Sequence, residues 1–353
     1  MAKIDAYLGE ILERKGSDLH FLAGDPPRIR LYGELLTLRP ERLDAEFVKE
    51  CLYEIMPKQA VRRFESKDGT DFAHFVPGVA RFRVNVMRQL NGMGAVFRVI
   101  PSTALTLAQL NMPDSVRNLC RVNSGLILVT GKTGSGKSTT LAAMIDDINT
   151  REKGHIITIE DPIEFVHQRK SCLISQREVG VHTPGFSSAL LSALREDPDV
   201  VLVGELRDLE TISIAVTAAE MGILVMGTLH TNGAAQTVDR MVNQFPSDKQ
   251  SHVRTMLSTS LRGVVSQQLL QRADKQGRVA ALEILVNTSA VANLIRQGKL
   301  DQLENTMQSG AQFGMRTMDM AIQALFDDRA ISGKTAYQKG INKSKFEPVK
   351  EQG

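Results

Sequence analysis

Gly131-Lys-Thr-Gly-Ser-Gly-Lys137-Ser138 is the stretch that decides the fold of this 353-residue chain. A short apolar run at residues 126–130 precedes it and predicts a buried strand. Residues 138–149 follow with apolar side chains at helical spacing and predict a helix. Glycines at such a turn let successive backbone N–H groups point inward, and the helix N-terminus adds partial positive charge. The stretch therefore predicts a cradle for phosphate groups.

The spacing of this loop is typical of a site for a nucleoside triphosphate. We expect Lys137 to reach the β and γ phosphates of ATP, and the Ser138 hydroxyl to bind Mg²⁺. The alternative, a glycine-rich turn without a ligand, is disfavoured by the strand before the loop and the helix after it. The loop residues that we expect to bind the nucleotide are Gly131, Thr133, Gly134, Ser135, Gly136, Lys137, Ser138 and Thr139.

Further apolar runs follow the loop and alternate with helical patterns. Residues 156–159, 200–203 and 223–229 predict buried strands, and residues 187–195 predict a helix. Continuous apolar strands separated by helices imply a mostly parallel sheet covered on both faces. The predicted fold class is therefore α/β.

A carboxylate follows one of these strands directly. Glu205 comes after residues 200–203, with Gly204 in the position where many P-loop ATPases carry Asp. We expect Glu205 to hold the water shell of Mg²⁺ or to orient the attacking water. The alternative is a solvated glutamate at the end of a strand.

A second acidic cluster ends the strand at residues 156–159. Its carboxylates project over the edge of the sheet where α/β proteins bind ligands. Glu164 is the candidate general base, while Glu160 and Asp161 assist through metal-bound water or hold the loop. The alternative is that these residues only form a turn around a proline.

His230 follows the predicted strand at residues 223–229. Its place at the carboxyl end of a strand favours a sensor of the γ-phosphate, although a lone histidine is usually structural. A GTPase is disfavoured because Asn342-Lys-Ser-Lys345 lacks the Asp that would bind guanine.

The first hundred residues have a different character. Residues 1–100 mix helical patterns with short strand-like runs and predict a smaller α+β domain. One of these runs, residues 29–38, reads as a single strand. The polar, proline-punctuated residues 101–113 predict a linker to a second domain at residues 114–353.

The strand predicted at residues 80–88 has one cationic face. Arg81, Arg83 and Asn85 alternate with apolar residues, so the charged side chains lie on the side away from the core. The pattern alone indicates a solvated cationic surface.

Composition excludes several classes of protein. With 42% hydrophobic and 24% charged residues, the chain is globular and long enough for two domains. The net charge of +3 comes from the last twenty residues. The rest of the chain is neutral overall, so its composition does not indicate a basic surface that binds nucleic acid. No apolar run is long enough to span a membrane, and we expect no signal peptide. The three cysteines form no paired motif and are expected to be buried thiols.

The motifs together resemble the secretion ATPases that drive type II secretion and type IV pili. The N-terminal stretch Gly16-Ser-Asp18-Leu-His20-Phe is similar to the pilus retraction ATPases within that family, and the resemblance runs from about residue 4 to residue 332. The other motifs are the loop at residues 131–138, Ile159-Glu-Asp-Pro-Ile-Glu164-Phe165, Leu194-Arg-Glu-Asp-Pro-Asp199 with Val203-Gly-Glu205-Leu-Arg207-Asp208, and Gly227-Thr-Leu-His230-Thr.

This resemblance implies a PAS-like N-terminal domain and a RecA-like ATPase core, assembled as a homohexamer. It implies Mg²⁺-dependent ATP hydrolysis that powers pilus retraction on the cytoplasmic side of the inner membrane, against a platform protein. It further implies that Arg81, Arg83 and Arg98 reach the nucleotide of a neighbouring subunit. An arginine in that role contributes about 10³ to 10⁵ in rate.

Other interpretations stay open. Pilus assembly and type II secretion ATPases carry a larger N-terminal extension and a four-cysteine zinc site, which three cysteines cannot form. Ala290-Val-Ala-Asn-Leu-Ile-Arg-Gln297 stands where the retraction family has A-I-R-N-L-I-R-E, which favours an accessory retraction paralogue. Gly204 favours a non-hydrolysing scaffold, and a DNA-dependent motor is disfavoured by the neutral body.

Overall fold

The structure is a computed structural model that describes residues 2–31, 34–100 and 104–352. Its contacts divide the chain into two compact units, each described here by itself. The first unit is Met1–Thr103 with Pro162–Val166, and the second is Ala104–Asp161 with His167–Gly353.

The expected linker falls partly within the second unit. Residues 101–103 lie outside the described residues. Leu107 and Met112 are buried against the core of the second unit. Helix α4 (Asp114–Leu119) starts directly after Pro113, which stands at its N-cap position.

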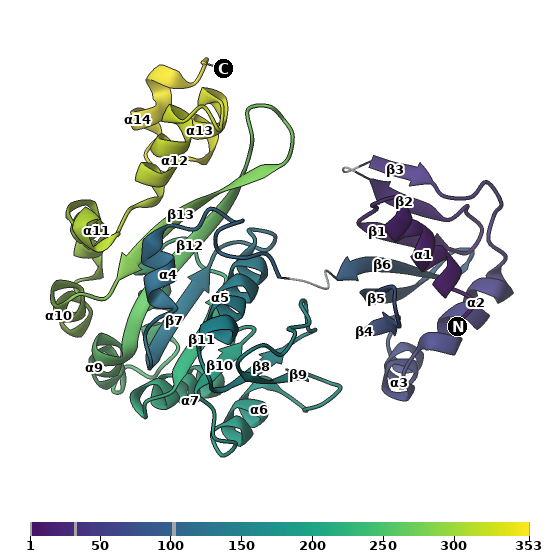
Figure 1. Cartoon of the computed structure of the whole chain (residues 1–353), viewed down its shortest axis with the longest axis horizontal. Helices are drawn as coiled ribbons and strands as arrows, with labels where there is room; N and C mark the ends of the chain where they lie inside the picture. Colours follow the sequence, from purple (N-terminus) through teal and green to yellow (C-terminus); the bar gives the residue numbers. More distant parts are fainter. Residues whose placement is uncertain (1, 32–33, 101–103, 353) are drawn as a thin grey trace. The chain divides into compact units, whose positions relative to one another are not determined.

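The first unit is an antiparallel sheet that shares one hydrophobic core with three helices (Figure 1). The strand order is β3-β2-β1-β6-β5-β4, and all neighbouring strands are antiparallel. The elements are α1 (Asp5–Glu13), β1 (Asp18–Leu22), β2 (Arg28–Leu31), β3 (Glu34–Thr37), α2 (Ala45–Ile55), α3 (Lys58–Ser66), β4 (Gly69–Val76), β5 (Ala80–Gln89) and β6 (Gly92–Ile100).

Strand β5 has the two faces that its sequence predicts. Phe82, Val84 and Val86 are fully buried, whereas Arg81 and Arg83, which alternate with them, are half-buried. The prediction of one strand over residues 29–38 is wrong. The chain forms β2 and β3 there, which pair with each other as an antiparallel hairpin.

The second unit contains a mostly parallel sheet with helices on both faces (Figure 1). Its strand order is β13-β12-β7-β11-β10-β8-β9, in which only the β12–β13 pair is antiparallel. This confirms the predicted α/β class. The strands are β7 (Gly125–Thr130), β8 (His155–Glu160), β9 (Leu173–Glu178), β10 (Val200–Val203), β11 (Leu224–Leu229), β12 (Leu261–Gln271) and β13 (Arg278–Val286).

The helices of the second unit cover the sheet and continue beyond it towards the C-terminus. Short 3₁₀ turns at Leu300–Gln302, Ala311–Phe313 and Glu347–Val349 connect or follow some of them. The helices after α4 are α5 (Lys137–Arg151), α6 (Phe186–Ala193), α7 (Leu209–Glu220), α8 (Ala234–Asn243), α9 (Gln250–Ser260), α10 (Ser289–Gln297), α11 (Leu303–Ser309), α12 (Met318–Asp327), α13 (Gly333–Lys339) and α14 (Lys343–Phe346).

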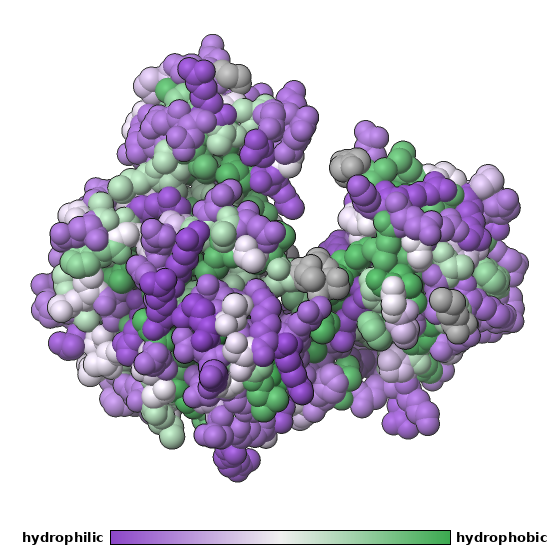
Figure 2. Space-filling view, in the orientation of Figure 1, coloured by the Kyte–Doolittle hydropathy of each residue, from purple (hydrophilic) through white to green (hydrophobic). Residues whose placement is uncertain are grey.

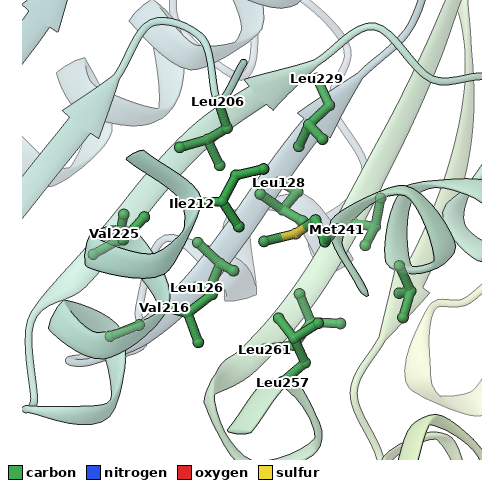
Figure 3. Packing of buried hydrophobic residues seen from close by; sticks show 14 of the residues in the cluster. Leu126, Leu128, Leu206, Ile212, Val216, Val225, Leu229, Met241, Leu257 and Leu261 are labelled. Atoms are coloured by element: carbon green, nitrogen blue, oxygen red, sulfur yellow. The ribbon is translucent and has the colours of Figure 1, made fainter. Parts of the chain in front are cut away.

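The central strands are buried along their whole length, because helices cover both of their faces. Figure 3 shows one of these faces, where Leu126 and Leu128 of β7 point towards Ile212 of α7 and Met241 of α8. On the other face, Ile127 packs in a separate cluster with residues of α4 and α5. This packing fixes the carboxyl ends of the strands that position the site.

The surface of the C-terminal helices is mostly hydrophilic in the view of Figure 2. Cys51, Cys120 and Cys172 are free and buried, as the sequence predicts. Within the described ranges, every helix is too short or too polar to cross a bilayer.

Candidate functional site

Parallel strands of the second unit end at one edge of the sheet, and expected site residues lie at the ends of β7, β11, β10 and β8 (Figure 1). Strand β7 runs into the loop at residues 131–136, and its neighbour β11 runs into His230. Strand β10 lies beside β11 and leads to Glu205, while β8 lies beside β10 and ends at Glu160. The segments therefore share the edge where α/β proteins bind ligands.

The loop at residues 131–136 depends on its glycines. Gly131, Gly134 and Gly136 have φ angles of 139°, 78° and 90°, in the left-handed region that favours glycine. A Cβ on Gly131 would lie 2.4 Å from the backbone oxygen of Gln267. Larger residues would therefore strain the backbone and collide with β12.

The loop also offers donors for an anion. Helix α5 begins at Lys137, and its first N–H groups have no intrahelical partner, as in any α-helix. Gly136 at the N-cap offers them no side-chain acceptor either. The buried Nζ of Lys137 donates to the carbonyl oxygens of Gly131 at 2.9 Å and Lys132 at 3.2 Å. Ser135 Oγ is buried without a hydrogen-bond partner among the described residues. A buried ammonium, an unpaired hydroxyl and helix N–H groups fit a phosphate group.

Gln267 supports this loop from the neighbouring strand, and the sequence analysis missed it. The side chain is 3% exposed, and its Oε1 accepts a hydrogen bond of 2.7 Å from Thr140 Oγ1 of α5. The pairing of Ser266 with Thr130 places Gln267 one residue beyond the end of β7. The sequence signal was three polar residues, Ser266-Gln-Gln268, inside an apolar run, in a strand that was not predicted.

Glu205 lies between two basic side chains. Its Oε2 accepts from Arg207 at 2.7 Å, and its Oε1 lies 3.4 Å from Nε2 of His230. Burial opposes ionisation of this carboxyl, but the hydrogen bond and charge of Arg207, with those of His230, hold its pKa below the ordinary value. Glu205 is therefore an anion at neutral pH, ready to accept a hydrogen bond from water.

The close surroundings of Gly204 explain why this position, directly before Glu205, has glycine and not aspartate. A Cβ at this position would lie 3.1 Å from the Ile159 carbonyl oxygen and 3.3 Å from Glu160 Cα. The backbone N–H of Gly204 donates to the same Ile159 oxygen at 2.7 Å, and its carbonyl accepts from Thr228 Oγ1 at 2.6 Å. Close packing between β8 and β10 therefore leaves little room for a side chain here.

Glu160 is the last residue of β8, and Asp161 follows it directly. Glu160 Oε1 accepts from Thr158 Oγ1 of its own strand at 2.7 Å and from Gln176 Nε2 of the neighbouring β9 at 3.3 Å, so both strands orient it. The charge of Asp161 acts on Arg207, together with Glu205, and contributes to the raised pKa of that guanidinium. Arg207 thus pairs with Glu205 after β10 and is also influenced by the charge of Asp161 after β8.

Glu164 lies outside this group. It falls in Pro162–Val166, which the contacts assign to the first unit, between the buried side chains of Ile163 and Phe165. Its role as general base stays a prediction.

The three candidate arginines belong to the first unit. Arg81 and Arg83 lie on β5 and Arg98 on β6, where Arg83 and Arg98 are directly paired across the strands. Arg98 Nε donates to Asp18 Oδ1 at 2.8 Å, whereas Arg83 stands 4.0 Å from Asp71. Their action on a neighbouring subunit's nucleotide stays a prediction.

Ser138 and Glu205 are the residues expected to bind Mg²⁺ together with substrate phosphates. No group of three or more His, Cys, Asp or Glu side chains in the described segments could hold a metal alone. Ser138 lies in the first turn of α5, after β7, and Glu205 follows β10, with β11 between these two strands. Mg²⁺ keeps several waters and binds substrate phosphates, so two protein oxygens are compatible with it. Their role as Mg²⁺ ligands stays a prediction.

A glycine loop between strand and helix, a buried lysine and acids at the ends of neighbouring strands define a P-loop ATPase. The family described as "Type II/IV secretion system protein" matches residues 1–331, and the chain belongs to this family.

Similar proteins include retraction ATPases of pili. The "Type IV pilus retractation ATPase PilT" of Pseudomonas aeruginosa is 52% identical over 92% of this chain and 94% of its own length. The "Type IV pilus ATPase PilU" of the same organism is 40% identical over 95% of this chain and 87% of its own length. A solved structure, "Crystal Structure of the Pilus Retraction Motor PilT and Bound ADP", covers 99% of both chains with a TM-score of 0.91 and 42% identity.

Proposed function

We propose that this protein is an ATP-hydrolysing motor that powers the retraction of type IV pili. One observation carries the proposal: the similarity to a pilus retraction ATPase extends over 94% of that relative, including its N-terminal part. A P-loop site alone would fit many NTPases. A match over both units supports the retraction motor rather than a generic ATPase.

The site residues have distinct tasks in the proposed hydrolysis. Water attacks the γ-phosphorus while the bond from phosphorus to the bridging oxygen breaks. Lys137 and the α5 N-terminus neutralise charge on the phosphate oxygens, and anionic Glu205 orients the water. We assign the response to the γ-phosphate to His230, because its Nε2 lies 3.4 Å from Oε1 of Glu205. When held by Ser138 and, through water, Glu205, Mg²⁺ neutralises phosphate charge.

We propose that the protein acts as a homohexamer, in which a neighbouring subunit contributes to hydrolysis. We infer that arginines of the first unit, Arg81, Arg83 or Arg98, compensate transition-state charge on the nucleotide of a neighbour. Closure of each subunit around its nucleotide would then turn hydrolysis into movement within the ring. We place the hexamer in the cytoplasm, at the inner-membrane base of the pilus, against a platform protein.

Two variants test the ATPase. Lys137→Ala should abolish both nucleotide binding and phosphate release, because the ammonium is the main charge facing the phosphates. Glu205→Ala should abolish phosphate release while nucleotide binding remains. Fluorescent-nucleotide titration and a phosphate assay on the assembled protein separate these steps. Unchanged turnover in Glu205→Ala would remove that residue from the mechanism.

Deletion of the gene tests the direction of the motor. Cells that still make pili but never withdraw them would support retraction, whereas cells without pili would support an assembly ATPase. Restoration by the wild-type gene, but not by Lys137→Ala, is the matched control.

An accessory retraction ATPase is the second candidate. Helix α10 carries Ala292 and Gln297 where the retraction family has Arg and Glu. Gln297 donates to Asn293 within the same helix at 3.2 Å instead of carrying a charge. Retraction that persists in the deletion strain but loses force would support this role.

A further inference from the structure

One buried carboxylate serves two helices that are distant in the sequence. Glu283 of β13 is 5% exposed. Its Oε1 accepts from the backbone N–H of Ala234 at 2.6 Å, and its Oε2 accepts from the backbone N–H of Met318 at 3.1 Å. Ala234 and Met318 are the first residues of α8 and α12.

The two helices depend on this carboxylate to different degrees. The N-cap of α8 is Gly233, which has no side chain to offer, so Glu283 supplies the cap. Helix α12 has a cap of its own, because Thr317 accepts from Met320 N–H at 3.3 Å. Burial raises the pKa of Glu283, while the two N–H groups and both helix dipoles favour its anionic form.

Helix α8 also touches the base of the phosphate loop. Thr237 Oγ1 of α8 lies 3.5 Å from Oγ1 of Thr130, the residue directly before Gly131. It also bonds to Thr231 Oγ1 at 2.7 Å, one residue after His230. The start of α8 is therefore in contact with two segments that are expected to respond to nucleotide.

Helix α12 is joined to the C-terminal helices. Met318 and Ile322 pack in one core with Ala336 of α13 and Phe346 of α14. Asp319 accepts from the backbone N–H groups of Ile341 and Asn342, at 2.7 and 2.9 Å. A shift at the start of α12 would therefore move the whole cluster.

We propose that Glu283 is a positioning residue that couples the nucleotide loop to helices α12, α13 and α14. The coupling runs from Thr130 to Thr237 of α8, through the shared carboxylate, to Met318 of α12. Because both N-termini bond to the two oxygens of one buried carboxylate, movement of α8 with nucleotide either draws α12 with it or breaks a hydrogen bond. The inference rests on nucleotide binding at residues 131–138, and its test separates the two.

Hydrogen exchange of the full-length protein, with and without Mg-ADP, tests the coupling. In the wild type, amides of the phosphate loop and of the first turn of α12 should both slow down on binding ADP. In Glu283→Gln, one oxygen becomes an NH₂ group that cannot accept, so one helix loses its partner. The loop should still be protected, while the response of α12 should fall at least several-fold.

Two single-helix variants are the matched controls. Thr317→Ala weakens α12 alone, so exchange there should rise in both states while the response to ADP remains. Ser266→Ala removes the acceptor of Gly233 N–H, a 2.9 Å bond beside α8, and leaves the shared carboxylate in place. The response of α12 should survive in this variant as well.

The outcomes decide between the claims. An α12 that does not respond to ADP in the wild type, or that responds equally in Glu283→Gln, would overturn the coupling. A phosphate loop that is never protected would instead refute nucleotide binding. Should Glu283→Gln fail to fold, Glu283→Asp keeps both oxygens on a shorter side chain, and a full α12 response there would contradict the shared-carboxylate geometry.

Discussion

Glu205 keeps its charge because Arg207 and His230 outweigh the effect of its burial. Its folded pKa lies below the ordinary value of 4.5, so the pair with Arg207 contributes to stability above that pH. The contribution disappears as the pH falls through the folded pKa. The same carboxylate is proposed to orient water. We therefore expect the rate of hydrolysis and the stability from this ion pair both to fall as the pH drops through the folded pKa of Glu205.

Arg207→Ala should move the acid limb of ATP hydrolysis to higher pH. Without the guanidinium, burial is opposed only by His230, and the pKa of Glu205 rises. Phosphate release measured from acid to neutral pH reports the shift, with Arg207→Lys as the control that retains a positive charge. Identical acid limbs in wild type and Arg207→Ala would show that this ion pair does not set the protonation of Glu205.

Gly204→Ala should destabilise the second unit by about 1–3 kcal/mol, as for other overpacked sites. The new Cβ would press on backbone atoms of Ile159 and Glu160, which can give way only if β8 and β10 separate. Urea unfolding measures the loss. Gly78→Ala in the first unit is a useful contrast, because space around that glycine is open and any cost would come from its φ of 74°.

Residues of the site differ in how far the sequence predicts them. Lys137, Glu205 and His230 follow predicted strands or motifs, so their common sheet edge could be inferred before the structure. Gln267 and Glu283 could not, because each acts on a segment far away in the chain. Their roles depend on the β12–β13 hairpin, whose pairing has no local motif.

At the scale of elements, helix α7 shows how the segment after Glu205 is fixed. Asp208 is its N-cap and accepts from Thr211 N–H at 2.8 Å and from Thr211 Oγ1 at 2.9 Å. Ile212 and Val216 then pack against the central sheet (Figure 3). The cap therefore links the strand end to the core.

Asp208→Ala should lower the free energy of unfolding by about 1 kcal/mol, the usual loss for an N-cap. Thermal unfolding measures it, and Asp208→Ser should recover most of the stability because serine also caps. Equal losses in both variants would mean that the charge of Asp208, not its cap, is what matters.

Elements were predicted best where burial is complete. Strands β7, β10 and β11 are largely continuous apolar runs. Such runs are typical of parallel strands that helices bury on both faces. Strands β9 and β12 are mixed in polarity because β9 lies at the edge and β12 meets the phosphate loop. Their patterns therefore resemble loops or helices in the sequence.

For the whole molecule, the described residues form separate hydrophobic cores in the two units. Phe97 is fully buried in the first unit and Leu128 in the second. Each core can therefore lose stability without direct loss of packing in the other.

Phe97→Ala and Leu128→Ala should lower two different thermal transitions. The cavities should cost about 3–5 and 2–5 kcal/mol, each within its own unit. Differential scanning calorimetry resolves the transitions, and excess ADP should raise only the one that Leu128→Ala lowers. One transition shifted alike by both substitutions would contradict independent cores.

The buried cysteines give each unit a native reporter. Burial raises the pKa of Cys51 in the first unit to about 11 and that of Cys120 in the second to about 12. Alkylating reagents attack the thiolate, so both thiols stay silent while their surroundings are closed. The rate at which each becomes modified would therefore count the openings of its own unit, without an introduced label, and could be followed while the motor turns over ATP.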